Sequence, residues 1–448
     1  MLTYKEALDY IYSFTDYEKQ IAYSYAPEHF NLARVEQLLG LLGDPHRRFK
    51  SVHIAGTKGK GSTSAMIASI LCAAGYRTGL YTSPHLHSFR ERILLDGQMI
   101  GQAQVAALLE HLKPLVERIE GITTFEIMTA LAFTYFAQRG AEFAAIEVGL
   151  GGRLDATNVI EPLVSVITSL SYDHTEVLGT TLSEIAREKA GIIKEGIPVV
   201  SAPQEPEAMA VIEGVCRERG AELVVVGRDW TCDAREANLE GQSFKVQGPW
   251  SEVQGLDLWI PLLGRYQLIN ATAAVAAIEN LREQGIPIPE ASVREGLRQV
   301  RWPGRLEVLG QEPWVVVDGA HNGDSARKLV AAMMELFHHR RLILVFGALT
   351  GHSVPDMLDA LLPAADKVIL TRANRIRAVA TSDLLREVHA RRREAEVTER
   401  VAEALERALA LASPEDLICA TGSLSIAAEA REAWLRSHGG EVPEVDPS

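Results

Sequence analysis

Short apolar runs alternate with helical stretches along the first half of the chain, and this alternation restricts the fold more than any other feature. The apolar runs cover residues 51–55, 78–82, 143–148, 164–168 and 198–201, and helical patterns cover residues 62–74, 124–138 and 182–193. Each apolar run is bounded by glycine, proline or polar residues, as buried strands are. Buried strands separated by helices are typical of a parallel sheet. We therefore predict an α/β fold with a mainly parallel sheet.

The rest of the chain predicts a small antiparallel sheet and then a second α/β series. Residues 228–262 alternate polar and apolar side chains between turn residues, and residues 266–282 return to a helical pattern. Strand patterns at 314–317, 341–346, 367–371 and 417–420 follow, with helices between them that include 383–393 and 399–411. Pro303-Gly304 indicates a hinge, because both residues interrupt regular structure. We predict a larger domain of residues 1–299 and a smaller, Rossmann-like α/β domain of residues 300–448.

Charge and cysteine usage narrow the expected partners and compartment. The 448 residues include 45 Lys and Arg against 59 Asp and Glu, a net charge of −14. Nonspecific binding to nucleic acid or anionic membrane needs a basic excess, so we expect neither partner, although a local basic pocket can still hold a small anion. The four cysteines are far apart, as expected for reduced cysteines rather than a disulfide framework. No uncharged apolar run is long enough for a membrane span. The first residues lack the apolar core of a signal peptide, so we expect a cytoplasmic protein.

A glycine-rich segment, Ala55-Gly56-Thr57-Lys58-Gly59-Lys60-Gly61-Ser62-Thr63, follows the first strand pattern and opens a helix. Glycines let backbone N–H groups converge on phosphate oxygens, and a helix N-terminus adds partial positive charge. We predict that this P-loop binds ATP, with Lys60 neutralising the β and γ phosphates; the alternative is a tight turn packed through glycines. The segment departs from the GxxxxGK(S/T) pattern, because Ile54 holds the first glycine position and Gly61 follows the lysine. The usual hydroxyl ligand for magnesium is therefore displaced.

Polar side chains follow other strand patterns, at the edge where α/β sheets bind ligands. Glu147 lies near the end of a buried run, and a buried carboxylate needs a cation, for which Mg²⁺ is a natural choice; a strand-end salt bridge is the alternative. Ser83 follows the run before it, where a turn or helix-cap role is the alternative. His174 follows a third run, with Asp173 as an orienting neighbour. Lys189 lies among small and apolar residues of a helical stretch, where a solvated lysine is the alternative.

Ten ordered segments carry a resemblance to a known family. They are GTKGKGS, YTSPHL, TTFE, EVGLGGRLDATN, DHTEVLG, EKAGIIK, GRYQLINA, PGR, DGAHN and TGSLS, and the resemblance covers roughly residues 32–430. In this order they resemble the folylpolyglutamate synthase/dihydrofolate synthase family of the Mur ligase superfamily. The chain departs from the family at Lys58, where an asparagine is usual, and at Ser425, where an aromatic residue often follows Leu424. Lys58 either adds positive charge near the phosphates or points to water.

The resemblance implies a role for each segment. For ATP it implies Gly59, Lys60, Gly61, Ser62, Asn270, Arg305 and Asp318, and for magnesium it implies Ser83, Glu147 and His174. For the pterin substrate it implies Thr123, Thr124, Phe125, Glu126, Leu154, Asp155 and Ala156, and Ser423 and His321 would face the cleft where the amino acid docks. Lys60, Lys189 and His321 are the implied catalytic residues, with Lys189 carbamylated. One or two Mg²⁺ are the implied cofactors, and K⁺ is a further candidate.

The reaction implied by the resemblance is ATP-dependent amide formation through an acyl phosphate. The substrates would be ATP, L-glutamate and a reduced folate or dihydropteroate, and the sequence leaves open whether one or both pterins are used. We expect a monomer. One alternative is a different Mur-type amino-acid ligase, which the short segment of 55 residues before Gly56 argues against. The other is a P-loop NTPase switch without ligase chemistry, which the separate set of predicted metal ligands disfavours.

Overall fold

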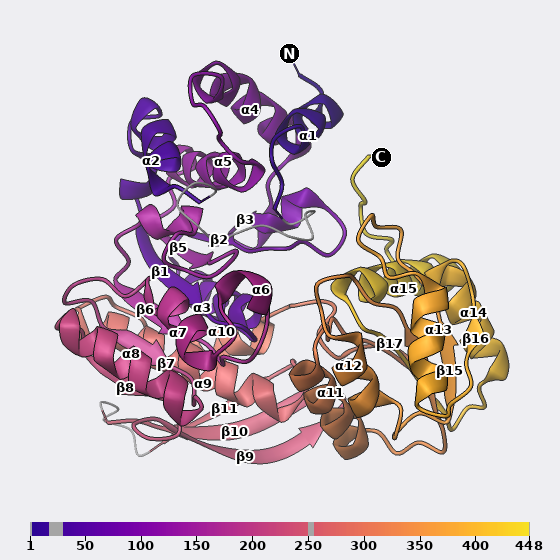
Figure 1. The fold of residues 1–448 in the computed structure, drawn as a ribbon. Coiled ribbons are helices and arrows are strands. Elements are labelled where there is room, and N and C mark those ends of the chain that lie inside the picture. Colours follow the sequence, from indigo (N-terminus) through magenta and orange to yellow (C-terminus); the bar gives the residue numbers. More distant parts are fainter. Residues whose placement is uncertain (1, 18–29, 250–254, 448) are drawn as a thin grey trace.

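The computed structural model describes residues 2–17, 30–249 and 255–447, which form two α/β domains and a small antiparallel sheet (Figure 1). The larger domain is built on an eight-stranded sheet in the order β4-β3-β2-β5-β1-β6-β7-β8. Its strands are β1 (Lys50–Ala55), β2 (Thr78–Tyr81), β3 (Ile93–Leu95), β4 (Gln98–Met99), β5 (Phe143–Glu147), β6 (Val164–Ile167), β7 (Val199–Ser201) and β8 (Leu223–Val225). The strands from β2 to β8 in this order run parallel, and β3 and β4 form an antiparallel edge.

Helices cover both faces of this sheet because its strands are apolar on both sides. One face packs against α1 (Tyr4–Tyr12), α2 (Leu32–Leu41), α4 (Gln102–Val116) and α5 (Thr124–Gln138). The other face packs against α3 (Lys60–Ala73), α9 (Arg265–Glu283) and α10 (Glu290–Gln299). A smaller core joins α6 (Thr175–Leu178), α7 (Leu182–Ala190) and α8 (Pro206–Glu218) to the sheet. Short 3₁₀ turns are η1 (Pro45–Arg47), η2 (Phe89–Arg92) and η3 (Ala156–Val159).

The helix that follows the glycine-rich segment is buried on nearly all sides. α3 packs against the sheet and also against α9 and α10, which come much later in the chain. The hydroxyl of Ser69 donates a hydrogen bond to the carbonyl of Gly296 at 2.6 Å, across 227 residues of sequence. A Cβ atom at Gly296 would lie 2.4 Å from the Cα of Ile70, so a glycine is required for this approach. The position of α3 therefore depends on distant helices.

Two further sheets complete the fold. The antiparallel sheet contains β9 (Thr231–Asn238), β10 (Gly241–Gln247) and β11 (Leu256–Ile260). The C-terminal domain has the strand order β12-β13-β17-β14-β15-β16, formed by β12 (Glu307–Gly310), β13 (Trp314–Val317), β14 (Leu342–Phe346), β15 (Lys367–Leu370), β16 (Glu396–Val397) and β17 (Leu417–Thr421). One face carries α11 (Gly323–Leu336), α12 (Val354–Leu361) and α13 (Thr381–Ala390), and the other carries α14 (Val401–Leu411) and α15 (Leu424–Ser437).

The predicted fold class is confirmed. Every predicted strand in the two parallel series is present, with each end within one residue of its prediction. The helix predicted over 182–193 ends at Ala190, because Gly191 follows it as the C-cap. Residues 228–262 hold the three antiparallel strands, apart from 250–254, which lie outside the described residues. The boundary between residues 299 and 300 stays a prediction.

The chain after α15 returns to the larger domain. The carboxylate of Asp446 accepts hydrogen bonds from the Tyr4 hydroxyl at 2.7 Å, the Ser88 hydroxyl at 2.8 Å and the Phe89 backbone N–H at 2.7 Å. Glu444 pairs with Arg90 on the same surface. These contacts tie the end of the chain to the larger domain.

Candidate active site

The predicted P-loop connects β1 to α3 and takes a conformation that needs its glycines. Gly56 has a φ of +147°, and a Cβ there would lie 1.9 Å from the Thr168 hydroxyl. Gly59 has a φ of +91° and is the N-cap of α3, so the helix begins at Lys60. A Cβ at Gly59 would lie 2.2 Å from the side-chain oxygen of Asn270 on α9. The loop therefore ends at a helix N-terminus, whose first N–H groups have no partner within the helix, with Asn270 beside it.

The side chain of Lys60 faces Glu147 at the end of β5. Its Nζ lies 3.8 Å from Oε1 of Glu147, and the backbone N–H of Ser83 donates to Oε2 at 3.2 Å. Burial raises the pKa of Glu147, and the charge of Lys60 opposes this shift. A buried carboxylate with a raised pKa is stabilised by a further cation. Ser83 and Glu147, two of the three predicted metal ligands, are thus together.

The third predicted metal ligand, His174, is held differently. It is the N-cap of α6 with a φ of 49°, and its ring centroid lies 5.9 Å from that of His352. Among the described residues, His174 forms no hydrogen bond or ion pair with Ser83 or Glu147. Desolvation lowers the pKa of His174 to about 3, so its imidazole is neutral and able to bind a cation. In the described part of the chain, no three His, Cys, Asp or Glu side chains are grouped as metal ligands.

Lys189 is not a solvated lysine. It lies buried in the last turn of α7, and its Nζ donates to the carbonyl of Gly56 in the phosphate loop at 2.9 Å. Burial lowers the pKa of Lys189 to about 7, and the charge of Lys60 adds to this shift. An amine with this pKa is partly neutral near pH 7 and can act as a nucleophile toward CO₂.

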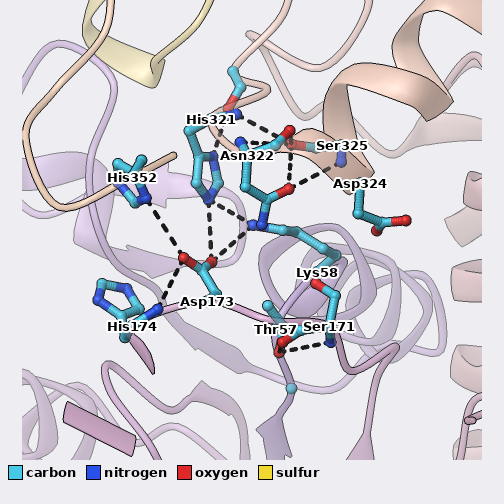
Figure 2. A network of polar contacts seen from close by, with 12 residues as sticks. Thr57, Lys58, Ser171, Asp173, His174, His321, Asn322, Asp324, Ser325 and His352 are labelled. Carbon is cyan, nitrogen blue, oxygen red and sulfur yellow. Dashed lines mark hydrogen bonds and ion pairs between the residues drawn. The ribbon is translucent and has the colours of Figure 1, made fainter. Parts of the chain in front are cut away.

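Asp173 is the centre of a polar network that joins the two domains (Figure 2). Its Oδ2 accepts a hydrogen bond from Lys58 Nζ at 2.8 Å and lies 3.5 Å from His321 Nε2; its Oδ1 lies 3.5 Å from His352 Nδ1. Lys58 Nζ is also 2.7 Å from His321 Nε2. Burial opposes ionisation of Asp173, but the Lys58 ammonium holds its pKa well below the ordinary value. Lys58 and Asp173 come from the larger domain, and the two histidines come from the C-terminal domain.

The C-terminal side of this network consists of loops at the carboxyl ends of neighbouring strands. His321 follows β13, His352 follows β14 and Ser423 follows β17, and these strands are adjacent in the sheet. Ser423 is buried and caps α15 by accepting from the N–H of Ile426. Desolvation, followed by the charge of Lys58, lowers the pKa of His321 to about 4. The predicted positions His321 and Ser423 therefore share one edge.

The remaining predicted ATP residues lie near the loop or at the domain connection. Asn270 donates to Gln267 at 2.9 Å, and Gln267 lies 3.4 Å from the Ser62 hydroxyl. A Cβ at Gly61 would lie 2.7 Å from the Trp302 ring, so this ring covers the start of α3. Arg305 lies close to Gly319. The carboxylate oxygens of Asp318 accept from the backbone N–H groups of Leu306 and Ala320 at 2.7 and 2.8 Å.

The predicted pterin segments use several polar groups to hold their own backbone. Thr123 and Glu126 form a capping box at the start of α5, and Arg34 pairs with the buried Glu126 at 3.0 Å. Thr124 is buried and donates to the carbonyl of Ile11 at 3.0 Å. The polar groups of Thr123, Thr124 and Glu126 are therefore already engaged in contacts that hold the fold.

The two other parts of the pterin prediction lie near the glycine-rich turn after β5. Asp155 accepts from the backbone N–H groups of Leu150 and Thr157 at 2.9 and 3.0 Å, so that it fixes Leu154 and Ala156 on either side. The ring of Phe125 leaves no space for a side chain at Gly149, since a Cβ there would lie 2.5 Å from it. Phe125 and the Gly149–Ala156 turn therefore meet.

Sequence reasoning missed four residues of this site. His352 and Trp302 have no strong local signal, although His352 follows a strand of the same sheet as His321. Arg34 was outside every motif. The sequence marks Asp173 only as a neighbour of His174, yet in the structure its carboxylate takes part in contacts between the domains. The Thr-x-x-Glu spacing of Thr123 and Glu126 is a capping-box signature and was available in the sequence.

Comparison with known proteins gives matches to both domains. Residues 54–278 match the family described as "Mur ligase middle domain", and residues 304–424 match "Mur ligase, glutamate ligase domain". The dihydrofolate synthase/folylpolyglutamate synthase of Bacillus subtilis is 40% identical over 79% of this chain and 83% of its own length. A probable bifunctional folylpolyglutamate synthase/dihydropteroate synthase of Haloferax volcanii is 39% identical over 90% of this chain, which spans about half (48%) of that relative.

Solved structures are similar over almost the whole chain. Folylpolyglutamate synthase of Mycobacterium tuberculosis complexed with ADP is 33% identical, with a TM-score of 0.87 over 98% of this chain and 99% of that chain. Escherichia coli FolC in complex with DHPP and ADP is 30% identical, with a TM-score of 0.83 over 95% and 96% of the two chains. Among the described residues, no helix is long and apolar enough to cross a membrane.

Proposed function

Because the chain belongs to the folylpolyglutamate synthase/dihydrofolate synthase family of Mur ligases, we propose that it adds L-glutamate to tetrahydrofolate or folylpolyglutamate, and also to 7,8-dihydropteroate, at the expense of ATP. The observation that carries this proposal is the 2.7 Å contact between Lys58 of the phosphate loop and His321 of the other domain. It brings a phosphate-binding loop and the strand-end side chains of the C-terminal domain to one place. A phosphorylated acid and an amine could meet there.

The proposed reaction needs no nucleophile from the protein. The pterin carboxylate attacks the γ-phosphorus of ATP, so that an acyl phosphate forms and ADP leaves. The neutral amine of L-glutamate then attacks the acyl carbon. The C–N bond forms, the nitrogen releases a proton, and phosphate leaves with the electrons of the broken C–O bond. The protein contributes positioning and charge: N–H groups from Gly59 to Ser62 and the ammonium of Lys60 hold the phosphates. Asn270, Arg305 and Asp318 complete the proposed ATP site.

Residues of this chain also fit a magnesium ion. Glu147 supplies a buried carboxylate at the strand end and Ser83 lies beside it through its backbone N–H, while the neutral imidazole of His174, which contacts neither residue among the described ones, is the proposed third donor. Carboxylate and hydroxyl oxygens are ligands that Mg²⁺ accepts. These three residues would hold the ion, which when bound offsets negative charge on the transferring phosphate. The ammonium of Lys60 approaches Glu147 from the phosphate loop and partly balances the charge of its carboxylate.

Purified protein with ATP, Mg²⁺ and labelled L-glutamate tests the function directly. We expect incorporation of glutamate with tetrahydrofolate and with dihydropteroate in separate reactions, and ADP release that requires both glutamate and the pterin. A P-loop switch would release ADP without either. If glutamate is incorporated with neither tetrahydrofolate nor dihydropteroate, the proposal is rejected.

Lys189 is expected to make activity depend on pH and CO₂ together. Only a neutral amine adds CO₂, and with a pKa of about 7 roughly nine-tenths of Lys189 is neutral at pH 8 but only about one-tenth at pH 6. Initial rates in degassed buffer should therefore fall as the pH is lowered from 8 to 6. Added bicarbonate should raise them most near pH 7.

The matched variant for this experiment is Lys189→Arg, which keeps the positive charge but forms no stable carbamate. Its low activity should not respond to bicarbonate at any pH. Equal bicarbonate responses in the wild type and in Lys189→Arg would exclude carbamylation at this position.

A further inference from the structure

We propose that the ammonium of Lys58 occupies the receptor that the amine of the incoming amino acid must enter, so that Lys58 is a positioning residue that sets the affinity for L-glutamate. The inference rests on the proposed function. It follows from the hydrogen-bond geometry around His321 and Lys58.

The tautomer of His321 follows from its contacts. Its Nδ1 lies 2.8 Å from the carbonyl oxygen of Gly319. A carbonyl oxygen only accepts, so Nδ1 carries a proton and donates it. Its Nε2 lies 2.7 Å from the Lys58 ammonium, which only donates. Nε2 is therefore the unprotonated nitrogen of a neutral ring, and its lone pair is directed at Lys58.

Two acceptors from different domains converge on the Lys58 nitrogen. One is the His321 lone pair at 2.7 Å, and the other is the Asp173 carboxylate at 2.8 Å (Figure 2). The two acceptors lie 3.5 Å from each other with the ammonium between them. Together they form a receptor for a primary ammonium group, which offers three N–H donors and one positive charge.

An amino acid in solution carries the same head group as lysine. Its α-ammonium can make the two hydrogen bonds that Lys58 makes here. Of the three groups His321 is nearest to solvent, because its side chain is 33% exposed while those of Lys58 and Asp173 are 14% and 8% exposed. An amine that enters beside His321 therefore has to displace Lys58 from these acceptors.

Lys58 can leave this position without leaving the site. Its backbone N–H donates to the carbonyl of Ser169 at 3.0 Å, so the loop stays anchored beside the residues after β6 while the side chain moves. The exchange replaces one ammonium by another, and the charge next to Asp173 is conserved. A neutral side chain at position 58 would instead leave the Asp173 charge available and the receptor empty.

The test compares Lys58→Met and Lys58→Asn with the wild type at saturating pterin. The KM for L-glutamate is expected to fall about tenfold in both variants, and by more than any change in the KM for ATP. Lys367→Met, which removes an exposed lysine at the start of β15, should leave both constants unchanged. Melting temperatures of all variants establish that they are folded.

Methylammonium probes the receptor without the rest of the substrate. In Lys58→Met it should inhibit competitively with glutamate, at a concentration at least tenfold lower than in the wild type. Tetramethylammonium, which has no N–H donor, should not inhibit at the same ionic strength. An unchanged or higher glutamate KM, or equal methylammonium inhibition in wild type and variant, would overturn the inference. A wild type that incorporates no glutamate would instead reject the proposed function itself.

Discussion

Lys60→Ala is expected to lower kcat for glutamate addition at least about a thousand-fold, equivalent to about 4 kcal/mol of transition-state stabilisation. The ammonium of Lys60 is the cation that extends from the first turn of α3 toward the Glu147 carboxylate. Loss of a cationic side chain that contacts a transferring phosphate has effects of about 10³ to 10⁵ in other phosphoryl-transfer enzymes. The measurement is a single-turnover assay of glutamate incorporation with saturating ATP.

The fold should survive this substitution. Lys60 lies 3.8 Å from Glu147, and burial already raises the pKa of this carboxyl, so protonation can neutralise it when the lysine is absent. Circular dichroism and the melting temperature check this. Lys367→Ala, on the exposed end of β15, is the control that should keep full activity. Near-normal activity in a folded Lys60→Ala protein would contradict the assignment of the loop to ATP.

Gly59→Ala is expected to weaken nucleotide binding at least about a hundred-fold, and Gly75→Ala is its matched control. Both glycines have a φ of +91°, so each alanine carries a similar backbone strain of about 1–2 kcal/mol. A Cβ at Gly75 meets nothing within 4 Å, whereas a Cβ at Gly59 would lie 2.2 Å from the Asn270 oxygen. The extra clash must move either the N-cap of α3 or Asn270, and both belong to the proposed ATP site.

Binding of ADP by calorimetry separates the two effects. Gly75→Ala should lose about 1–2 kcal/mol of unfolding free energy and bind ADP like the wild type. Gly59→Ala should lose ADP affinity by a factor of at least a hundred. If the two variants bind ADP equally well, the close approach of Asn270 to the loop has no role in nucleotide binding.

The sequence predicted the site residues at the strand ends of each sheet better than it predicted the contacts between the two domains. Glu147, Ser83 and His174 were predicted because they lie at the ends of buried runs, and the carboxyl ends of parallel strands lie at one edge. The contact of Lys58 with Asp173 and His321 depends on how the sheets of the two domains face each other. No periodicity or local spacing encodes that orientation. For this reason the sequence left open whether Lys58 meets the phosphates or water, and in the structure its ammonium pairs with the carboxylate of Asp173.

A related difficulty concerns residues with two plausible uses. Glu126 was predicted at the pterin site, and in the structure its carboxylate caps α5 and pairs with Arg34. Asp155 similarly holds the turn after β5 with its carboxylate. A motif specifies which residue types occur together. A carboxylate that fixes a loop and a carboxylate that binds a ligand are the same residue type in the sequence. Hydrogen-bond partners are needed to distinguish them.

The burial of α3 between the sheet and the later helices has a consequence for synthesis. The helix that carries the phosphate loop is completed by α9 and α10, and the Ser69–Gly296 contact spans 227 residues. At about 5–20 residues per second a ribosome needs roughly 10–45 s to make that length. During this interval the apolar surface of α3 has no cover on one side, so the nascent chain would be a natural client for chaperones that shield exposed helices. Competence for nucleotide binding is then acquired late, when the last helix of the larger domain has docked.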